Sequence, residues 1–274
     1  MTEKQICDLD LKQIIDSGQS FRMEQTADDE YKLIAMGRMI RIRQNGQNFT
    51  FDCGEQEFEE IWAPYFDLDT DYGKIKDSVD EKDVYLRTAV KAGYGVRVLR
   101  QDIWEMIVTF LISQNNNITR IKKSVDLLCK SAGAKRTTGD GEEYFLFPTA
   151  GEIADLGMEG LSTLGLGYRD KYIDHMAHEV ISGRFDPEEL KRMEYGDAHK
   201  KLTDQYGIGK KVADCICLFG LHHVDAFPID THVKKILEQH YQDGFPFERY
   251  KGYAGILQQY MFYYNLYTLK HRSK

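Results

Sequence analysis

The sequence predicts an α+β protein in which an amino-terminal antiparallel-sheet domain is followed by an all-helical domain. Two observations support this prediction. Up to about residue 95, alternating apolar residues and turn signals favour strands. From Leu99 onward, apolar residues recur every three or four positions, as in amphipathic helices. Because 274 residues suffice for two moderate domains, we expect an α/β domain at 1–96 and a helical domain at 97–274.

The amino-terminal region contains a hairpin signal. The run from Tyr31 to Arg43 has β-favouring alternation, and residues 49–53 alternate in the same way. Asn45-Gly46 lies between these runs, and this dipeptide favours the tight turn of a β-hairpin. A short helix is expected over 55–66.

The rest of the chain has helical periodicity. Apolar stripes indicate one helix over about 99–111 and another over about 118–128. Residues 132–148 contain three glycines and one proline, and we expect an irregular surface loop there. Further helices are expected near 150–165, 168–182, 187–206, 210–221, 231–241 and 247–266, and the last of these could pack back between the two domains.

Composition restricts the class of protein. Hydrophobic residues make up 42% and charged residues 29%, as in ordinary globular proteins. The five cysteines are odd in number and scattered, which favours reduced thiols over a disulfide framework. No apolar run approaches the ~20 residues that span a bilayer, and no targeting signal is evident. We therefore expect a soluble monomer of the cytoplasm or nucleoid with no membrane association.

The net charge of −8 is unusual for a protein that binds nucleic acid. The charge is unevenly distributed along the chain, however. Residues 201–274 contain 10 basic and 7 acidic side chains, so they have a net charge of +3, and the first 200 residues have −11. A basic face in the carboxy-terminal part is therefore possible, with weak non-specific affinity for DNA.

The most informative motif lies between two predicted helices. Gly207-Ile208-Gly209 is followed by Lys210 and Lys211, and Asp230 comes 19 residues after Lys211. A Gly-x-Gly turn at a helix start exposes backbone N–H groups that can hold a phosphate. Lys210 and Lys211 are both candidate nucleophiles, but Lys211 precedes Cys215 by four residues, so these two share a helix face.

This motif resembles the helix–hairpin–helix DNA glycosylase signature. The string Gly-Ile-Gly-Lys-Lys-Val-Ala-Asp-Cys-Ile-Cys, from residue 207, resembles the 8-oxoguanine DNA glycosylase family in particular. The resemblance covers about residues 8–265 through at least four ordered motifs. It implies a glycosylase domain with its helix–hairpin–helix at about 197–221. It also implies base excision repair of double-stranded DNA, in which 8-oxoguanine opposite cytosine is flipped and excised and the strand is cut by β-elimination.

The resemblance assigns catalysis to two residues. Lys211 stands immediately before Val-Ala-Asp-Cys, the family's position for the lysine that forms a Schiff base with the sugar. The partial positive charge of a helix N-terminus and burial both favour the neutral amine that this reaction needs. Asp230 would support the departing base and the positive charge that develops on the sugar. No cofactor is required and no metal ligand is assigned, although the hairpin carbonyls could hold a structural cation.

A second group of positions is implied for the damaged base. 8-Oxoguanine has an N–H donor at N7 where guanine has an acceptor, so one backbone carbonyl can distinguish them. Gly18, within Ser17-Gly18-Gln19, matches the family's segment with that carbonyl. The residues implied to surround the flipped base are Gly18, Cys215, Pro228, Gln258 and Phe262.

A third group of positions concerns the DNA around the flipped base. The resemblance implies that Asn115 fills the vacated space, that Arg120 and Arg169 contact the orphaned cytosine, and that Tyr168 is a wedge beside it. Tyr206 stands where many family members have proline, which would make the hairpin less rigid. The residues implied to contact the DNA backbone are Gly207, Gly209 and His232.

Two alternatives stay open. The chain could be a glycosylase for another damaged base. However, no cysteines follow Cys217, whereas iron–sulfur relatives have four near the carboxy terminus, and alkylated-base glycosylases lack the lysine. The chain could also be a non-catalytic helix–hairpin–helix DNA-binding protein, which would need neither Lys211 nor Asp230.

Overall fold

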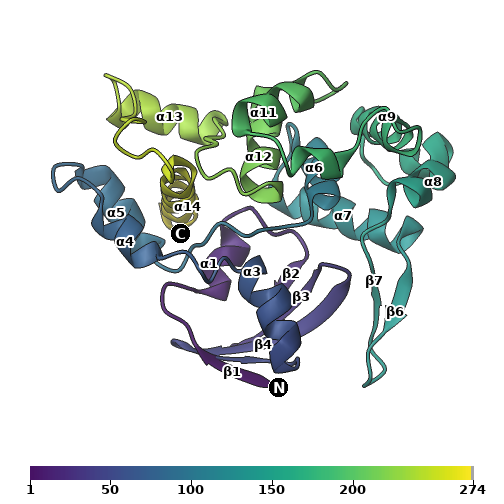
Figure 1. The fold of residues 1–274 in the computed structure, drawn as a ribbon, viewed down its shortest axis with the longest axis horizontal. Helices are drawn as coiled ribbons and strands as arrows, with labels where there is room; N and C mark the ends of the chain where they lie inside the picture. The colour runs from purple at the N-terminus through teal and green to yellow at the C-terminus, as the bar shows by residue number, and fades with distance from the viewer. Residues whose placement is uncertain (273–274) are drawn as a thin grey trace.

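A computed structural model describes residues 1–272 and shows a small sheet domain below a larger helical part (Figure 1). The predicted α+β fold class is confirmed. The larger sheet is antiparallel, with the strand order β1-β5-β4-β3-β2. Its strands are β1 (Thr2–Gln5), β2 (Met23–Gln25), β3 (Glu30–Ala35), β4 (Arg38–Asn45) and β5 (Asn48–Phe51).

Two tight turns connect the central strands. The predicted hairpin at Asn45-Gly46 is confirmed, because Asn45 pairs with Asn48 and Gly46 has φ +59°. The alternating run from Tyr31 to Arg43 is two strands rather than one. The chain reverses at Met36 and Gly37, whose φ values of +51° and +72° suit the right-handed twist of a two-residue hairpin.

The sheet packs against a short helical segment. The helix expected over 55–66 is present as three consecutive turns, and the middle one is a π turn: α2 (Glu55–Glu57), η1 (Phe58–Trp62) and α3 (Ala63–Tyr65). Burial of apolar surface from both elements stabilises this domain. The fully buried side chains include Leu33, Ile42, Phe51, Trp62 and Phe66.

Helices form most of the rest of the molecule, and most of them surround a second apolar core. The two helices expected from the stripes near 99–128 are present as α6 and α7. The helices are α1 (Leu11–Asp16), α4 (Tyr72–Asp77), α5 (Val84–Ala92), α6 (Ile103–Ser113), α7 (Ile118–Ala132), α8 (Ala150–Ser162), α9 (Arg169–Ile181), α10 (Pro187–Leu190), α11 (Tyr195–Thr203), α12 (Lys210–Gly220), α13 (Thr231–His240) and α14 (Ala254–Arg272).

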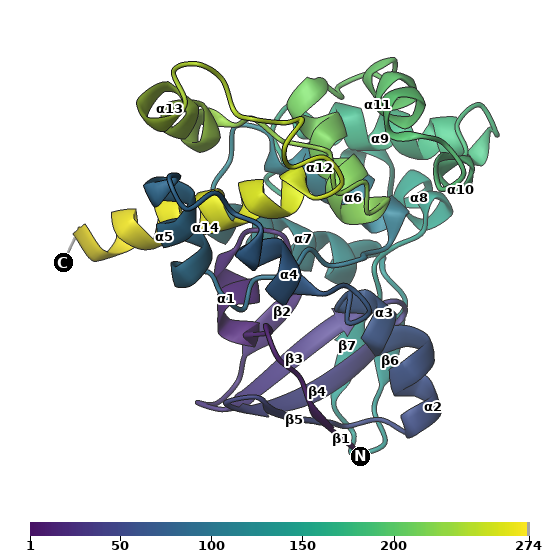
Figure 2. The same cartoon turned by 60° about the vertical axis from the view of Figure 1, so that its left-hand side comes forward.

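Two predicted helices have different bounds in the structure. The stretch at 187–206 is interrupted at residues 191–194, where the chain turns so that both Leu190 and Ala198 reach the core. The helix expected at 247–266 begins only at Ala254, because Gly252 has a left-handed backbone with φ +92°. This helix, α14, packs against α5 and α13 (Figure 2).

The expectation of an irregular loop over 132–148 is wrong. This segment forms a two-stranded hairpin of β6 (Lys135–Thr137) and β7 (Glu143–Phe145) that lies beside the amino-terminal sheet (Figure 2). Ion pairs attach it to that sheet: Arg41 pairs with Asp140 at 2.9 Å, and Lys32 pairs with Glu142 at 3.2 Å. Since these contacts join segments about 100 residues apart, local sequence patterns cannot predict them.

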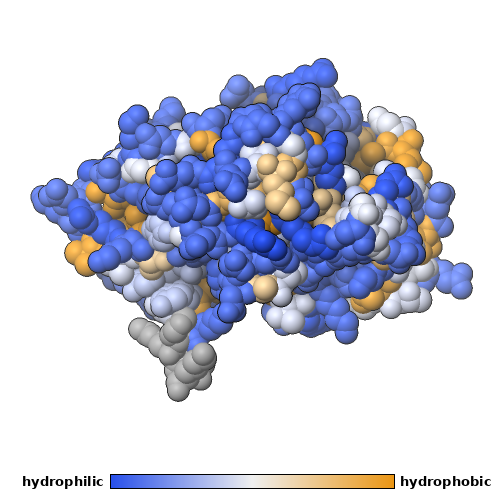
Figure 3. Space-filling model, turned by 90° about the horizontal axis from the view of Figure 1, so that it is seen from below, coloured by the Kyte–Doolittle hydropathy of each residue, from blue (hydrophilic) through white to orange (hydrophobic). Residues whose placement is uncertain are grey.

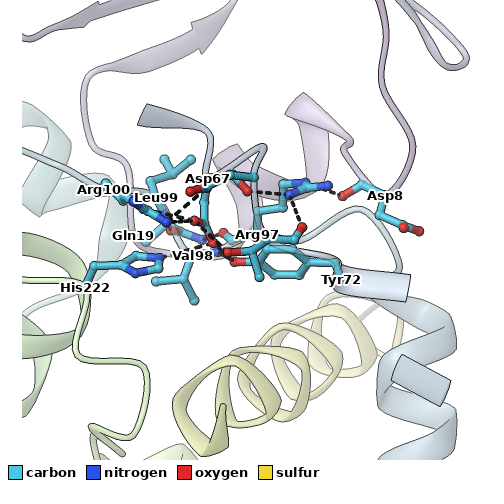
Figure 4. A network of polar contacts seen from close by, with 11 residues as sticks. Asp8, Gln19, Asp67, Tyr72, Arg97, Val98, Leu99, Arg100 and His222 are labelled. Carbon is cyan, nitrogen blue, oxygen red and sulfur yellow. Dashed lines mark hydrogen bonds and ion pairs between the residues drawn. The ribbon is translucent and has the colours of Figure 1, made fainter. Parts of the chain in front are cut away.

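A buried polar network joins the sheet domain to the helical part (Figure 4). The Asp67 side chain is fully buried and accepts hydrogen bonds from Arg100 Nε and Tyr72 Oη, both at 2.9 Å. Nε2 of His222, just beyond α12, lies 3.2 Å from the same carboxylate. Burial alone would raise the pKa of Asp67, but His222 and Arg100 outweigh it and lower this pKa from 3.8 to about 2.

The face in Figure 3 is mainly hydrophilic, and its apolar areas are small and separated. Exposed large apolar side chains occur singly on many elements, as in most folded proteins. Within residues 1–272, no helix combines the length and the hydrophobicity that crossing a membrane requires.

Candidate active site

The hairpin between α11 and α12 has the geometry of an anion site. Gly207 has φ +87°, and a Cβ there would lie 2.4 Å from Cγ of Tyr172, so glycine is required at this position. Gly209 is the N-cap of α12, and in the described part of the chain no side chain caps this helix start. The first N–H groups of α12 are therefore available to a phosphate.

Lys211 and Lys210 differ in their surroundings. Lys211 is half-buried in the first turn of α12, and its Nζ lies 5.6 Å from the centroid of the Phe110 ring. Lys210 is exposed and lines only the outer part of the cleft, whereas Lys211 lines both the outer and the inner parts. Burial raises the pKa of the neighbouring Cys215 thiol to about 11 in spite of the charge of Lys211. Cys215 is therefore a protonated, apolar wall of the cavity.

Asp230 lies opposite this helix at the start of α13. One of its carboxylate oxygens accepts hydrogen bonds from the backbone N–H groups of His232, at 2.9 Å, and Val233, at 2.8 Å. Asp230 is therefore the N-cap of α13, and this cap fixes the carboxylate at the edge of the cavity. His232 Nδ1 lies 3.0 Å from Oδ1 of Asn265, and its ring packs edge-on against Phe262.

The cleft has a wide outer part and a narrow inner part. The outer cavity, of about 850 Å³, is bordered by both the Asn115 loop and Asp230. The inner cavity, of about 40 Å³, has room for only a few water molecules, so it is much narrower than the outer part. The side chains that line the inner cavity are Ser17, Gly18, Phe110, Lys211, Cys215, Phe219, Pro228, Asp230, Gln258, Gln259 and Phe262.

Phe262 closes the inner cavity against Gly18. A Cβ on Gly18 would lie 3.2 Å from Cε1 of this ring. Beneath the ring, Gln258 is buried, and its Nε2 donates to the carbonyl of Pro228 at 2.9 Å. Its Oε1 accepts from Nε2 of Gln259, also at 2.9 Å, and Oε1 of Gln259 is buried without a hydrogen-bond partner among residues 1–272.

The sequence motif did not show which side chain fixes the Gly18 loop in place. That side chain is Gln19. Gln19 is fully buried; its Nε2 donates to the carbonyl of Arg97 at 2.8 Å, and its Oε1 accepts from the N–H of Leu99 at 2.9 Å (Figure 4). Gln101 Nε2 donates to the Gln19 carbonyl at 3.0 Å. The Gly18 loop, where φ is +73°, is thus fixed to the segment that joins the two domains. The sequence gives no signal for this role, because Gln19 lies among other polar residues between Asp16 and Arg22.

The residues predicted to face the opposite strand are mostly exposed. Asn115 has φ +45° and lies in a turn after α6. The Arg120 side chain is exposed and forms no hydrogen bond or ion pair within residues 1–272. Tyr168 is 46% exposed at the start of α9. All three are accessible from solvent, and Asn115 also lines the outer cavity.

Arg169 differs from these residues. It is only 6% exposed, and its guanidinium donates to three backbone carbonyls, those of Gln114, Asn115 and Leu166. The structure therefore brings Arg169 to the Asn115 loop but directs it at protein carbonyls. Within the described part of the chain, no group of three metal-ligating side chains occurs, and a hairpin cation stays a prediction.

A helical domain in which a Gly-x-Gly hairpin, a following lysine and a capping aspartate border one cavity defines a helix–hairpin–helix DNA glycosylase fold. Comparison with known families agrees with this class. Residues 2–107 match the amino-terminal domain of 8-oxoguanine DNA glycosylase, and residues 108–244 match the HhH-GPD superfamily of base excision DNA repair proteins. The chain belongs to the 8-oxoguanine DNA glycosylase family, as the resemblance implied.

Individual relatives agree with this assignment. An N-glycosylase/DNA lyase of Saccharomyces cerevisiae is 31% identical over 86% of this chain and 69% of its own length. One from Arabidopsis thaliana is 30% identical over 80% of this chain, which spans 63% of that relative. The 8-oxoguanine glycosylase/lyase of Clostridium acetobutylicum, solved with double-stranded DNA that has cytosine opposite 8-oxoguanine, is 32% identical. Its TM-score is 0.90, with 98% of each chain covered.

Proposed function

We propose that this chain is a bifunctional DNA glycosylase that excises 8-oxoguanine opposite cytosine and then cuts the strand as an AP lyase. One observation supports this most strongly. Lys211, Asp230 and the Gly18 loop, which lie far apart in the sequence, line a single inner cavity that opens into a cleft large enough for a DNA strand. A non-catalytic DNA-binding module would not need that cavity.

Lys211 is the proposed nucleophile. Its neutral amine attacks C1′ of the sugar while the glycosidic bond breaks and the base leaves with the bonding electrons. Loss of the amine proton and opening of the sugar ring then give a Schiff base between Nζ and C1′. Removal of a C2′ proton from this Schiff base expels the 3′ phosphate, which is the β-elimination step. No cofactor enters these steps.

Asp230 is proposed to stabilise the positive charge that develops on the sugar. A carboxylate held by two N–H groups has a fixed direction, so it needs no reorganisation when that charge appears. Its position at the edge of the cavity beside Lys211 is consistent with this role.

The base would be recognised in the inner cavity. The Gly18 carbonyl would accept the N7–H of 8-oxoguanine and would meet a lone pair on guanine, an unfavourable contact worth about 1–3 kcal/mol. Gln258 and the unpartnered Oε1 of Gln259 supply polar groups for the Watson–Crick edge. Cys215 and Phe262 would cover the two faces of the base, and Pro228 the rim. Since the inner cavity is too small for a purine base, we propose that Phe262 moves to admit it.

The outer cavity would hold the DNA around the flipped nucleotide. Asn115 is proposed to fill the vacated space, Arg120 to contact the cytosine, and Tyr168 to act as the wedge. Gly207 and Gly209 would present N–H groups to the backbone, with His232 near a phosphate. We further propose that the protein acts as a monomer on the DNA of the cytoplasm or nucleoid.

Borohydride trapping across a panel of damaged duplexes tests this proposal. Borohydride reduces a Schiff base to a stable crosslink, so the substrate that crosslinks fastest identifies the lesion. We expect the fastest crosslinking with 8-oxoguanine opposite cytosine, and slower crosslinking when adenine is the opposite base. Faster trapping on another lesion would reassign the substrate, and no crosslink on any duplex would contradict the lyase mechanism.

A further inference from the structure

Three segments that are proposed to contact DNA lie together in the helical domain. They are the gap loop (residues 114–117), the wedge loop (residues 164–168) and the hairpin (residues 207–209). They connect three different helix pairs, α6 with α7, α8 with α9, and α11 with α12, which are neighbours in Figures 1 and 2. The contacts between these segments run largely through Gln114.

Gln114 connects the gap loop to the hairpin. Its side chain is half-buried, and Nε2 donates to the carbonyl of Gly207 at 3.0 Å and to that of Leu111 at 3.3 Å. Gly207 has the left-handed backbone that shapes the phosphate site. One amide therefore joins the proposed phosphate-binding turn directly to the residue that precedes Asn115.

Arg169 connects the gap loop to the wedge loop. Its Nε donates to the Gln114 carbonyl at 2.7 Å, Nη2 to the Asn115 carbonyl at 2.9 Å, and Nη1 to the Leu166 carbonyl at 3.0 Å. A second bond runs from Nη2 to Gln114. Four of the five guanidinium N–H groups are thus directed at protein carbonyls, so at most one remains for a base.

A row of aromatic rings also connects the wedge loop to the hairpin. Tyr172 packs edge-on against Tyr168 of the wedge loop, with a centroid distance of 5.6 Å, and against Tyr206 beside the hairpin, at 4.9 Å. The Tyr172 ring also fills the space where a side chain at Gly207 would lie. Tyr206, which replaces the proline of many relatives, therefore takes part in packing that proline could not provide.

We propose that Gln114 is a positioning residue that couples phosphate binding at the hairpin to insertion of Asn115 and Tyr168 into the duplex. A phosphate on the α12 N-terminus would fix the Gly207 turn. Gln114 forms a hydrogen bond with that turn, and Arg169 forms hydrogen bonds with Gln114. The gap and wedge loops would therefore keep fixed positions relative to the bound DNA backbone. Without the Gln114 amide, the hairpin could bind DNA while the gap loop moved independently. This inference rests on the proposed function.

The test compares Gln114→Met with Gln205→Met, both made in a Lys211→Gln background that halts chemistry. Methionine keeps the volume of glutamine but cannot form the hydrogen bond. Gln205 is a matched control: it is a half-buried glutamine next to the same hairpin, but its Nε2 donates to the Lys201 carbonyl of the preceding helix α11, at 3.3 Å. Pyrrolocytosine opposite 8-oxoguanine reports unstacking of the orphaned base, and anisotropy gives the Kd for undamaged duplex.

We expect Gln114→Met to reduce the pyrrolocytosine signal at saturating protein by roughly threefold to tenfold, the effect of losing one hydrogen bond. The Kd for undamaged duplex should stay unchanged, and Gln205→Met should change neither quantity. An unchanged signal at saturation, or an equal loss in Gln205→Met, would overturn the proposal. An equal loss of the signal and of the affinity for undamaged duplex would also overturn the proposal, because that result indicates a general structural role. If the wild-type protein forms no borohydride crosslink on 8-oxoguanine DNA, the proposed function itself fails.

Discussion

The two sides of the candidate active site are built differently. On the side that is proposed to bind the damaged base (the lesion side), Gly18, Cys215 and Gln258 line a narrow cavity, and buried hydrogen bonds fix the backbone around them. On the opposite-strand side, Arg120 and Tyr168 are exposed, and the Arg120 side chain has no protein partner within residues 1–272.

This difference indicates how each side can discriminate. A rigid cavity can place one carbonyl against one atom of a base, because the groups that orient it are already ordered. An exposed side chain must lose conformational freedom when it binds, so its contribution to affinity is smaller. We therefore expect substitutions in the cavity to affect catalysis strongly and substitutions on the exposed surface to affect mainly the choice of opposite base.

The largest effect is expected for Lys211→Gln. Without the amine no Schiff base can form, so borohydride trapping should disappear and turnover should fall by roughly 10⁴-fold or more. Lys210→Gln is the matched control, because it removes an adjacent lysine that lines only the outer cavity. Trapping that survives in Lys211→Gln and disappears in Lys210→Gln would reverse the assignment.

Asp230→Asn tests the carboxylate at the edge of the cavity. Asparagine can still cap α13, so the fold and lesion binding should be retained. Turnover should fall by roughly 10²–10³-fold, as when one electrostatic group is removed from an active site. Single-turnover excision and duplex affinity measure the two quantities separately. Normal excision in this variant would limit Asp230 to a capping role.

Gly18→Ala tests whether the position of the Gly18 carbonyl controls excision, separately from the backbone strain that alanine causes at a positive φ. Alanine at φ +73° is strained, and its Cβ would lie 3.2 Å from the Phe262 ring, so the carbonyl should shift. A small displacement of a binding group can reduce the excision rate by roughly 10²-fold. Gly46→Ala is the control, because that glycine has φ +59° but nothing within 4 Å of a Cβ. Equal losses in both variants would show that backbone strain alone accounts for the effect.

Arg120→Ala should affect only recognition of the base opposite the lesion. Losing one forked contact to cytosine should reduce the ratio of excision rates opposite cytosine and opposite adenine by roughly tenfold. Trapping opposite cytosine should remain measurable because the cavity is untouched. Arg136→Ala removes another exposed arginine, on β6, and should leave the ratio unchanged. An unaltered ratio in Arg120→Ala would remove its proposed role.

The parts of this fold that depend on local pattern were predictable from the sequence. The helices α6 and α7, the Asn45-Gly46 hairpin and the Asp230 cap each follow from residues within a few positions of one another. The β6–β7 hairpin was missed because ion pairs to the distant sheet stabilise it. The turn at Met36-Gly37 was missed because its dipeptide is not a common turn signal.

The candidate site, too, could be predicted only where local sequence motifs identify its residues. The motifs identified Lys211 and the Gly18 loop, and the structure places both at one cavity. No pattern could indicate that Gln19 holds the Gly18 loop or that Gln114 bonds Gly207, because both contacts join residues about 80 or more positions apart. Likewise, the sequence could not show that the Arg169 guanidinium is directed at backbone carbonyls, since burial of an arginine depends on tertiary packing.

The smallest effect on catalysis is expected from the network around Asp67, which supports the lesion side through the segment that joins the domains. Its pKa is about 2 in the folded protein and near 3.8 when unfolded, so the carboxylate stabilises the fold above pH 4 by about 2 kcal/mol. This stabilisation is lost as the pH falls from about 4 towards 2. Thermal unfolding of the wild type and Asp67→Asn should therefore differ at pH 5 and converge as the pH falls below 2. A difference in Tm that persists at pH 1 would show that the network stabilises the protein by packing rather than by charge.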